Sequence, residues 1–252
     1  MRKEGDRHFY KLLPKRITDL EMSIVYGPVR SWKIGTYLGV DPIYISPKVC
    51  SLNCIYCELG EGGILGEQKC QFIQTKVLME ELEHKRMDEV DLITFSGTGE
   101  PMLASNLKEM AEAIKARKNV SLAILTNSCH FLNNGSMEAL EPFDIVIAKL
   151  DAATGETFNK VNRPHSSISF ERVLEGIRMA AAEFPGSFRL QLMFMEANKN
   201  EVDQLGDLCN EIDPDVIYLN TPLRRCGISP LKEADMQEIR KHFRDFRLQS
   251  VF

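Results

Sequence analysis

The sequence lacks the long apolar stretches of a membrane protein, since no run approaches the roughly 18 apolar residues that a membrane-spanning helix needs. Its first residues, MRKEGDRHFYKLL, are charged and contain no apolar core of the kind found in a secretory signal. It also has no internal repeat and no low-complexity tract, which argues against repeat architectures and disordered chains. We therefore expect a globular, cytoplasmic protein with no membrane partner.

The chain also lacks a strong excess of positive charge. Its 252 residues include 31 Lys and Arg against 36 Asp and Glu, a net charge of −5, which argues against a dominant nucleic-acid surface. The charge is uneven, however, because residues 1–37 carry eight Lys and Arg against four Asp and Glu. We expect a basic N-terminal arm (residues 1–37) that packs on one domain formed by residues 38–252.

Short apolar, β-branched runs alternate with stretches of helical period, which is the pattern of consecutive βα units. The predicted strands are Pro42–Ser46, Asp91–Gly97, Ser121–Asn127, Asp144–Leu150, Phe188–Met195 and Asp215–Asn220. Several of them are apolar almost throughout, as strands covered on both faces must be.

Helices are predicted between these strands, where apolar residues recur every three to four positions. One stripe consists of Val173, Ile177, Ala181 and Phe184, another of Val202, Leu205, Cys209 and Ile212, and a last helix is expected from about Leu231 to Phe243. Right-handed βα units build either an open doubly wound sheet or a partial barrel, and periodicity does not choose between them. In both folds ligands bind at the carboxyl ends of the strands.

Seven cysteines are present, an odd number at uneven spacing, which is a poor disulfide framework. Three of them, Cys50, Cys54 and Cys57, form a C-x3-C-x2-C triplet in the segment CSLNCIYC. Three thiolates so close together point to one soft metal centre. A structural zinc site normally has four protein ligands, whereas a cubane cluster held by three cysteines keeps one iron open for a ligand. Zinc completed by a remote Cys or His, and a cluster that only carries electrons, remain the alternatives.

The triplet, with Tyr56 before its last cysteine, resembles the signature of the radical S-adenosylmethionine (SAM) superfamily. That resemblance implies a partial (β/α)6 barrel of the TIM type, with parallel strands and outer helices. It also implies a [4Fe–4S] cluster that cleaves SAM to a 5′-deoxyadenosyl radical, which abstracts a hydrogen atom from the substrate. The segments Tyr26–Val29, Leu38–Val40, FSGTGEP, KLDA and NRPH are similar to the wyosine-synthase-like branch, whose members modify tRNA.

The resemblance also implies a set of SAM-binding residues, one in the triplet and the others at the ends of three strands. These are Tyr56, Gly97, Thr98, Gly99, Glu100, Thr126, Asn127, Lys149 and Asp151. By their own chemistry, Glu100 suits an ammonium group, and Lys149 and Asp151 share one face of a strand because they are two positions apart. A plain βα turn, a helix cap and a structural ion pair are the structural readings of the same three segments.

Later loops provide candidate substrate ligands. Arg163, Asn220 and Arg224 suit an anionic substrate, and His165 is a candidate for proton transfer as well as binding. Cys226 lies in the same predicted region without an assigned role. Cys70, Cys129 and Cys209 are expected to be packed or partly exposed thiols.

Two features depart from related families. No cysteine precedes Cys50, whereas wyosine synthases carry cysteines there for a second cluster, and the chain has no room for a cobalamin domain. We therefore expect an oxidoreductase or lyase that acts on a small or nucleotide-like anionic substrate, with flavodoxin or ferredoxin as electron donor.

Three other functions remain open at this point. A tRNA-modifying enzyme would use the basic side chains of Arg2, Lys3, Arg7, Lys11, Lys15 and Arg16. An activase would install a radical on a partner protein, and an electron-transfer iron–sulfur protein would catalyse no reaction of its own.

Overall fold

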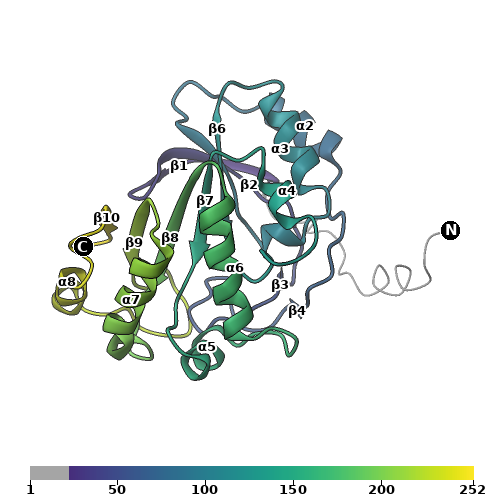
Figure 1. The fold of residues 1–252 in the computed structure, drawn as a ribbon. Coiled ribbons are helices and arrows are strands. Elements are labelled where there is room, and N and C mark those ends of the chain that lie inside the picture. The colour runs from purple at the N-terminus through teal and green to yellow at the C-terminus, as the bar shows by residue number, and fades with distance from the viewer. Residues whose placement is uncertain (1–22) are drawn as a thin grey trace.

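The computed structural model describes residues 23–252 (Figure 1). The six basic residues on which the tRNA hypothesis depends lie between positions 2 and 16, outside the described residues. None of the helices in the described range is both long and apolar enough to cross a membrane.

One sheet of eight strands organises the fold, in the order β1-β2-β5-β6-β7-β8-β9-β10. Every neighbouring pair from β2 to β10 is parallel, and β1 pairs with β2 in the antiparallel sense. The strands are β1 Val25–Ser31, β2 Gly35–Val40, β5 Leu92–Phe95, β6 Ser121–Thr126, β7 Ile145–Lys149, β8 Ser187–Met193, β9 Val216–Asn220 and β10 Leu248–Ser250. A separate two-stranded sheet joins β3 (Val49–Cys50) to β4 (Ile64–Leu65).

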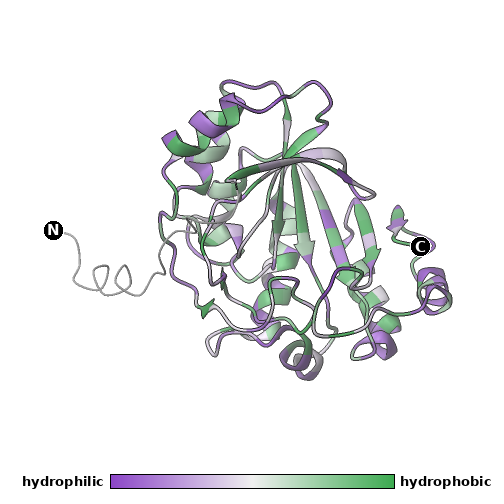
Figure 2. Cartoon of the chain, turned by 180° about the vertical axis from the view of Figure 1, so that it is seen from behind, coloured by the Kyte–Doolittle hydropathy of each residue, from purple (hydrophilic) through white to green (hydrophobic). Residues whose placement is uncertain are grey.

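The parallel strands spread downward from a narrow end in Figure 1, and the helices cover one face of the curled sheet. The helices are α2 Thr75–Glu83, α3 Leu107–Lys115, α4 Ser136–Leu140, α5 Gly155–Asn162, α6 Phe170–Glu183, α7 Val202–Ile212 and α8 Glu233–Lys241, with 3-10 turns at Pro101–Leu103 and Lys199–Glu201. The curled sheet with its outer helices is the expected partial barrel. In Figure 2 the strands are mainly hydrophobic, while hydrophilic residues gather on the helices and loops.

The two faces of the sheet differ in what they bury, because successive side chains of a strand point to opposite faces. On β7, Val146 and Ala148 belong to the large core between sheet and helices. Ile147 instead joins a small second cluster with Val216 and Tyr218, against which Ile34 packs from the turn between β1 and β2. The concave face therefore has its own apolar layer, and the β1–β2 turn covers it.

Five of the six predicted strands and all three predicted helices are present within a few residues of their expected bounds. The prediction of a strand at Pro42–Ser46 is wrong. The Asp41 carboxylate there accepts hydrogen bonds from the backbone N–H groups of Ile43 and Tyr44, which turns the chain, and Tyr44 has a φ of 40°. The first parallel strand is β2, which pairs with β5.

The boundary expected at residues 37/38 falls inside β2. Residues 25–37 of the expected basic arm form β1, the turn and the first half of β2, so this part of the arm is an integral part of the sheet.

Candidate active site

The three cysteines of the triplet lie on one short segment that begins at the end of β3. Cys50 is the last residue of that strand, and the loop that carries Cys54 and Cys57 follows it. The loop is anchored to the end of α5, because the Asn53 N–H donates to the Asn162 carbonyl at 3.0 Å and the Ile55 N–H to the Val161 carbonyl at 2.9 Å. All three cysteines are free, and the loop lies beside the carboxyl ends of the strands.

The glycine-rich segment after β5 holds β3 in place. Backbone hydrogen bonds join Val49 to Thr98 at 3.3 Å and to Glu100 at 3.0 Å. A Cβ on Gly99 would lie 2.0 Å from the Val49 carbonyl oxygen, and one on Gly97 would lie 2.2 Å from Cγ of Asp41. The glycines are therefore required by close backbone packing, and the segment fixes the position of Cys50.

The Glu100 carboxylate is almost fully buried and has three hydrogen-bond donors. It accepts from the Thr126 hydroxyl at 2.7 Å, the Asn127 N–H at 2.7 Å and the Met102 N–H at 3.0 Å. Burial raises the pKa of Glu100 to about 7, although these three bonds favour the charged form. Glu100 thus ties the end of β5 to the end of β6.

Two asparagine side chains contact the cysteine sulfurs. The Asn127 amide nitrogen lies 3.4 Å from Sγ of Cys50, and the Asn162 amide nitrogen lies 3.5 Å from Sγ of Cys54. They come from different loops, one after β6 and one at the end of α5. The structure thereby brings one predicted strand-end segment, that of Asn127, and the end of α5 to the cysteine loop.

Lys149, Asp151 and Tyr56 form one buried group. The Asp151 carboxylate accepts from the Tyr56 hydroxyl, from the Asn162 amide at 3.2 Å and from the Met193 N–H at 2.9 Å. The Lys149 amine lies 3.0 Å from the same carboxylate and 4.8 Å from the centre of the Tyr56 ring. It is buried without a well-aligned hydrogen bond, so its interaction with Asp151 is an ion pair with donor capacity to spare.

The candidate substrate residues are spread over a wider area. Arg163 forms an exposed ion pair with Glu61 at 2.8 Å, and Arg224 holds both carboxylate oxygens of Glu58 at 2.6 and 2.8 Å. The Asn220 side chain accepts from the N–H of Thr221. Arg163 and Arg224 are thus already paired with carboxylates, and the Asn220 side chain bonds a neighbouring backbone N–H.

His165 is joined to a surface chain of contacts. Its Nδ1 lies 2.6 Å from the Ser167 hydroxyl, which in turn bonds Glu67. Within residues 23–252, no hydrogen bond or ion pair links the His165 ring to the cysteines or to Lys149. Its role in proton transfer remains a prediction.

The other four cysteines pack within the fold outside the triplet. Cys70, Cys129 and Cys209 are buried, and the Cys226 thiol donates to the Ile228 carbonyl at 3.3 Å. Burial raises the pKa of Cys209 to about 12, so it is an inert thiol inside the core.

Sequence reasoning missed two buried polar groups. His130 is fully buried between the Ser51 hydroxyl and the Asn133 amide, and burial lowers its pKa to about 4. Lys33 reaches from the β1–β2 turn to the Gln191 side chain at 2.5 Å. His130 directly follows Cys129 after a strand, which is a usable signal, but Lys33 lies in the expected basic N-terminal arm, where a lysine gives no signal of a role inside the barrel.

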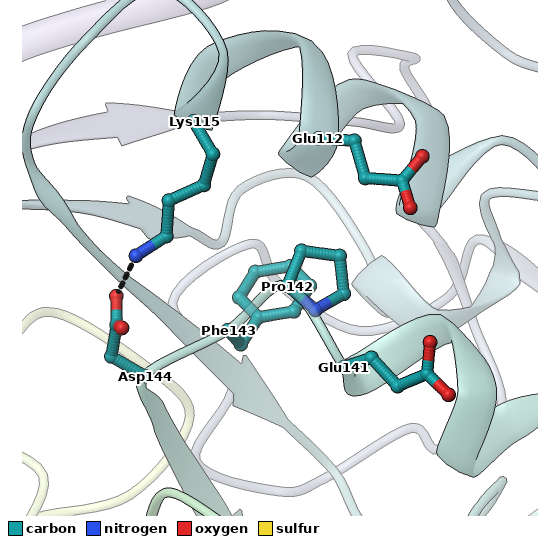
Figure 3. A pocket seen from close by; sticks show the side chains of 6 residues that line it. All are labelled: Glu112, Lys115, Glu141, Pro142, Phe143 and Asp144. Atoms are coloured by element: carbon teal, nitrogen blue, oxygen red, sulfur yellow. Dashed lines mark hydrogen bonds and ion pairs between the residues drawn. The ribbon is translucent and has the colours of Figure 1, made fainter.

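A surface hollow lies beside the amino ends of the central strands β6 and β7, opposite the carboxyl ends that carry this site (Figure 3). It is lined by Glu112, Lys115, Glu141, Pro142, Phe143 and Asp144. The Lys115 amine bonds the Asp144 carboxylate at 2.5 Å, and that carboxylate also accepts from the Leu122 N–H. Asp144 precedes β7, so the hollow belongs to the amino end of the strands and its polar groups serve the packing.

The residues of the triplet fit a cubane cluster better than a single metal ion. In the described part of the chain, no three His, Cys, Asp or Glu side chains converge as ligands of one ion. A cubane does not require this, because each thiolate binds a different iron. Burial raises the pKa of Cys50 to about 12 and also raises that of Cys54, so thiolates form there only against the positive charge of a metal centre.

A comparison with protein-family models decides the family: residues 44–209 match the model of the radical SAM superfamily. The chain belongs to the radical SAM superfamily. Radical SAM proteins are enzymes that use a [4Fe–4S] cluster and SAM, and the chemistry of Cys50, Cys54 and Cys57 agrees with that use.

The relatives of this radical SAM enzyme include proteins named without an activity. It is 38% identical over 202 residues to the UPF0026 protein slr1464 of Synechocystis, which covers 79% of this chain and 76% of the relative. It is 25% identical over 199 residues to a probable GTP 3′,8-cyclase of Saccharolobus islandicus, covering 77% of this chain and 61% of that protein.

Among solved structures, TYW1 with a lysine-pyruvate adduct bound is similar at a TM-score of 0.64 and 15% identity. The match covers 85% of this chain and 76% of that one. At this identity the likeness shows the shared half-barrel fold.

Proposed function

We propose that this radical SAM enzyme abstracts a hydrogen atom from a small or nucleotide-like anionic substrate bound inside the half-barrel. The observation that carries the proposal is the position of the cysteine loop, which lies at the carboxyl ends of the strands against Asn127 and Asn162. When bound, the reduced cluster supplies the electron that cleaves SAM to the 5′-deoxyadenosyl radical.

The residues around the loop divide the remaining work. Glu100, Thr126 and Asn127 fix the loop after β6 against the cysteine loop, so they hold SAM indirectly as well as through the contacts expected of them. Lys149 has spare donor capacity that suits the SAM carboxylate. Asp151, already bonded to Tyr56, Asn162 and Met193, orients Lys149 and limits its motion.

The anionic character of the substrate is supported by the cations of this region. Lys149, Arg224 and Lys33 are close enough for the first two to influence the pKa of the third. Because Lys149 and Arg224 are paired with Asp151 and Glu58, Lys33 supplies the positive charge that is left to attract an anion. One relative agrees with a nucleotide-like substrate, because it is named as a probable GTP 3′,8-cyclase.

The electron donor is expected to be a flavodoxin or ferredoxin. A tRNA or a protein substrate stays as an alternative partner, and both would bind outside the residues described here or at the exposed pairs Arg163–Glu61 and Arg224–Glu58. Loss of tRNA binding after deletion of residues 1–16 would favour the tRNA-modifying enzyme.

The decisive experiment measures 5′-deoxyadenosine formed from SAM by anaerobically reconstituted protein after reduction. We expect the nucleoside from the wild type and none from Cys54→Ala, which removes one ligand of the cluster. Cys209→Ala is the matched control, because it removes a buried thiol of α7 outside the triplet and should preserve both iron content and SAM cleavage. A full iron load with no cleavage, with or without candidate substrates, would contradict the proposal.

A further inference from the structure

The turn between β1 and β2 forms the floor of the half-barrel. Its three residues, Trp32, Lys33 and Ile34, face the concave side of the sheet. The Trp32 ring lies edge-on to Tyr218 with 6.2 Å between ring centres, and Ile34 packs against the apolar cluster of Ile147, Val216 and Tyr218. These two contacts fix the turn against the sheet.

Between Trp32 and Ile34, the Lys33 side chain extends past this apolar layer. Its amine donates to the Gln191 side-chain oxygen at 2.5 Å. Gln191 of β8 is paired with Lys149 of β7, the strand-end lysine expected to bind SAM. Lys33 therefore ends in the polar layer directly beneath the predicted SAM site.

Lys33 differs from the other cations around the site in its partner. Arg163, Arg224 and Lys149 are each paired with a carboxylate, those of Glu61, Glu58 and Asp151 respectively. In residues 23–252, the Lys33 amine forms no ion pair: it donates to a neutral amide and lies 5.8 Å from the centre of the Trp32 ring, so both of its partners are uncharged. Burial, followed by the charges of Lys149 and Arg224, lowers the pKa of Lys33 to about 8, and Glu58 opposes this only weakly. Its charge lacks a counter-ion inside the barrel.

We propose that Lys33, held by Gln191, is the floor of the substrate site and binds an oxyanion of the substrate, a carboxylate or a phosphate. An anion placed there forms an ion pair with the Lys33 ammonium, and no existing ion pair has to break. It also reduces the repulsion among Lys33, Lys149 and Arg224. The inference rests on the proposed function, because it takes the polar layer beneath Lys149 to be the substrate site.

The test follows the reactivity of Lys33 in the full-length, cluster-loaded protein with SAM bound. Lysines are acylated anaerobically at about pH 8, where Lys33 is partly neutral, and the modified peptides are quantified by mass spectrometry. Inorganic phosphate and glycolate serve as separate probes, with chloride at equal ionic strength as the reference. Lys69 is the matched control, because it too is half-buried with a lowered pKa and bonds a neutral group, the Ser136 hydroxyl, at 3.2 Å.

We expect one or both probes to protect Lys33 several-fold and to leave Lys69 unchanged, because a bound anion raises the pKa of Lys33 and covers its amine. Protection by phosphate alone identifies a phosphorylated substrate, and protection by glycolate alone identifies a carboxylate. Equal labelling with and without both probes, or equal protection of Lys33 and Lys69, would overturn the proposal.

A second measurement uses calorimetric titration of the protecting anion into the holoenzyme. Lys33→Met should weaken binding at least tenfold, Lys33→Arg should retain most of it, and Lys69→Met should match the wild type. Neither measurement requires turnover, so a protein that cleaves SAM but gives no protection refutes the Lys33 site alone. Protection in a protein that never cleaves SAM would refute the proposed function instead.

Discussion

The half-barrel has a rim at the carboxyl ends of its strands and a floor formed by the β1–β2 turn. The two regions use charged side chains in opposite ways. At the rim, the Asp151 carboxylate receives three hydrogen bonds and an ion pair, and the Glu100 carboxylate receives three hydrogen bonds. At the floor, Lys33 has only uncharged partners among the described residues, the Gln191 amide and the Trp32 ring. Buried charges are normally retained only when they are paired.

This difference distinguishes charged groups that hold the fold together from a charged group that is suited to binding a ligand. A carboxylate whose lone pairs are filled by backbone and side-chain donors holds strand ends together. A half-buried ammonium with only neutral partners costs stability until an anionic ligand binds. The rim carboxylates should therefore stabilise the fold, while the charge of Lys33 at the floor should lower stability when no ligand is bound.

Removal of the most heavily bonded rim carboxylate should have the largest effect. Asp151→Ala leaves the Lys149 charge, the Tyr56 hydroxyl and the Met193 N–H without their acceptor. Loss of one member of a buried pair typically lowers the free energy of unfolding by about 3–5 kcal/mol. Denaturant titration measures this, with Asp151→Asn as the isosteric control. A loss below about 1 kcal/mol would show that the rim network is not structural.

His130, the buried imidazole of the rim, should make stability depend on pH. Its pKa is lowered from 6.5 to about 4, so the unfolded chain gains a proton between these values and the folded chain does not. Its contribution is therefore present above pH 6.5 and is lost as the pH falls towards 4, by up to about 3 kcal/mol. The difference in unfolding free energy between wild type and His130→Gln should fall over this range. A difference independent of pH would show that His130 titrates normally.

At the floor, removal of the charge should raise the free energy of unfolding, whereas at the rim it lowers it. Lys33→Met should raise the free energy of unfolding at neutral pH by about 1–2 kcal/mol, a value reduced for the partial exposure of this lysine. The pKa of Lys33 is lowered from 10.5 to about 8, so the wild type recovers stability as the pH rises between these values. The advantage of the variant should therefore shrink from pH 8 upward in denaturant titrations. A destabilised variant at neutral pH would mean that Lys33 is a structural group like Asp151.

The smallest effect is expected at the exposed edge of the loops. Arg163→Ala removes the ion pair with Glu61, in which both side chains are largely exposed. Such pairs contribute at most about 1 kcal/mol, and the effect should vanish in high salt. Thermal unfolding at two ionic strengths measures this, and a double variant with Glu61→Ala isolates the pair. A loss of several kcal/mol in the free energy of unfolding would show that the stabilising network of the rim includes this surface ion pair.

The sequence predicted the parts of the fold that depend on a regular pattern. The strand at Asp144–Leu150 and the helix marked by Val173 and Ile177 are continuous apolar patterns, and both are present as β7 and α6. β2 (GTYLGV) was missed because its two glycines weaken the strand signal, whereas Pro42–Ser46 carries the signal but is turned by Asp41.

The site was predictable to the extent that its chemistry is local. Cys50, Cys54 and Cys57 lie within eight residues, so spacing alone brings them together. The contacts between Asn127 and Cys50 and between Lys33 and Gln191 join residues 77 and 158 positions apart. Such pairs depend on the closure of the sheet, for which a single sequence offers no signal.

The β1–β2 hairpin also has a consequence for how this enzyme could diversify. Residues 25–40 lie ahead of residues 44–209, the segment matched by the superfamily model. The segment that carries the cysteine triplet and the hairpin that forms the floor of the half-barrel are thus separate stretches of sequence. An exchange of the three turn residues between homologues would leave the cysteine loop untouched, so it would show whether this hairpin influences substrate choice independently of radical formation.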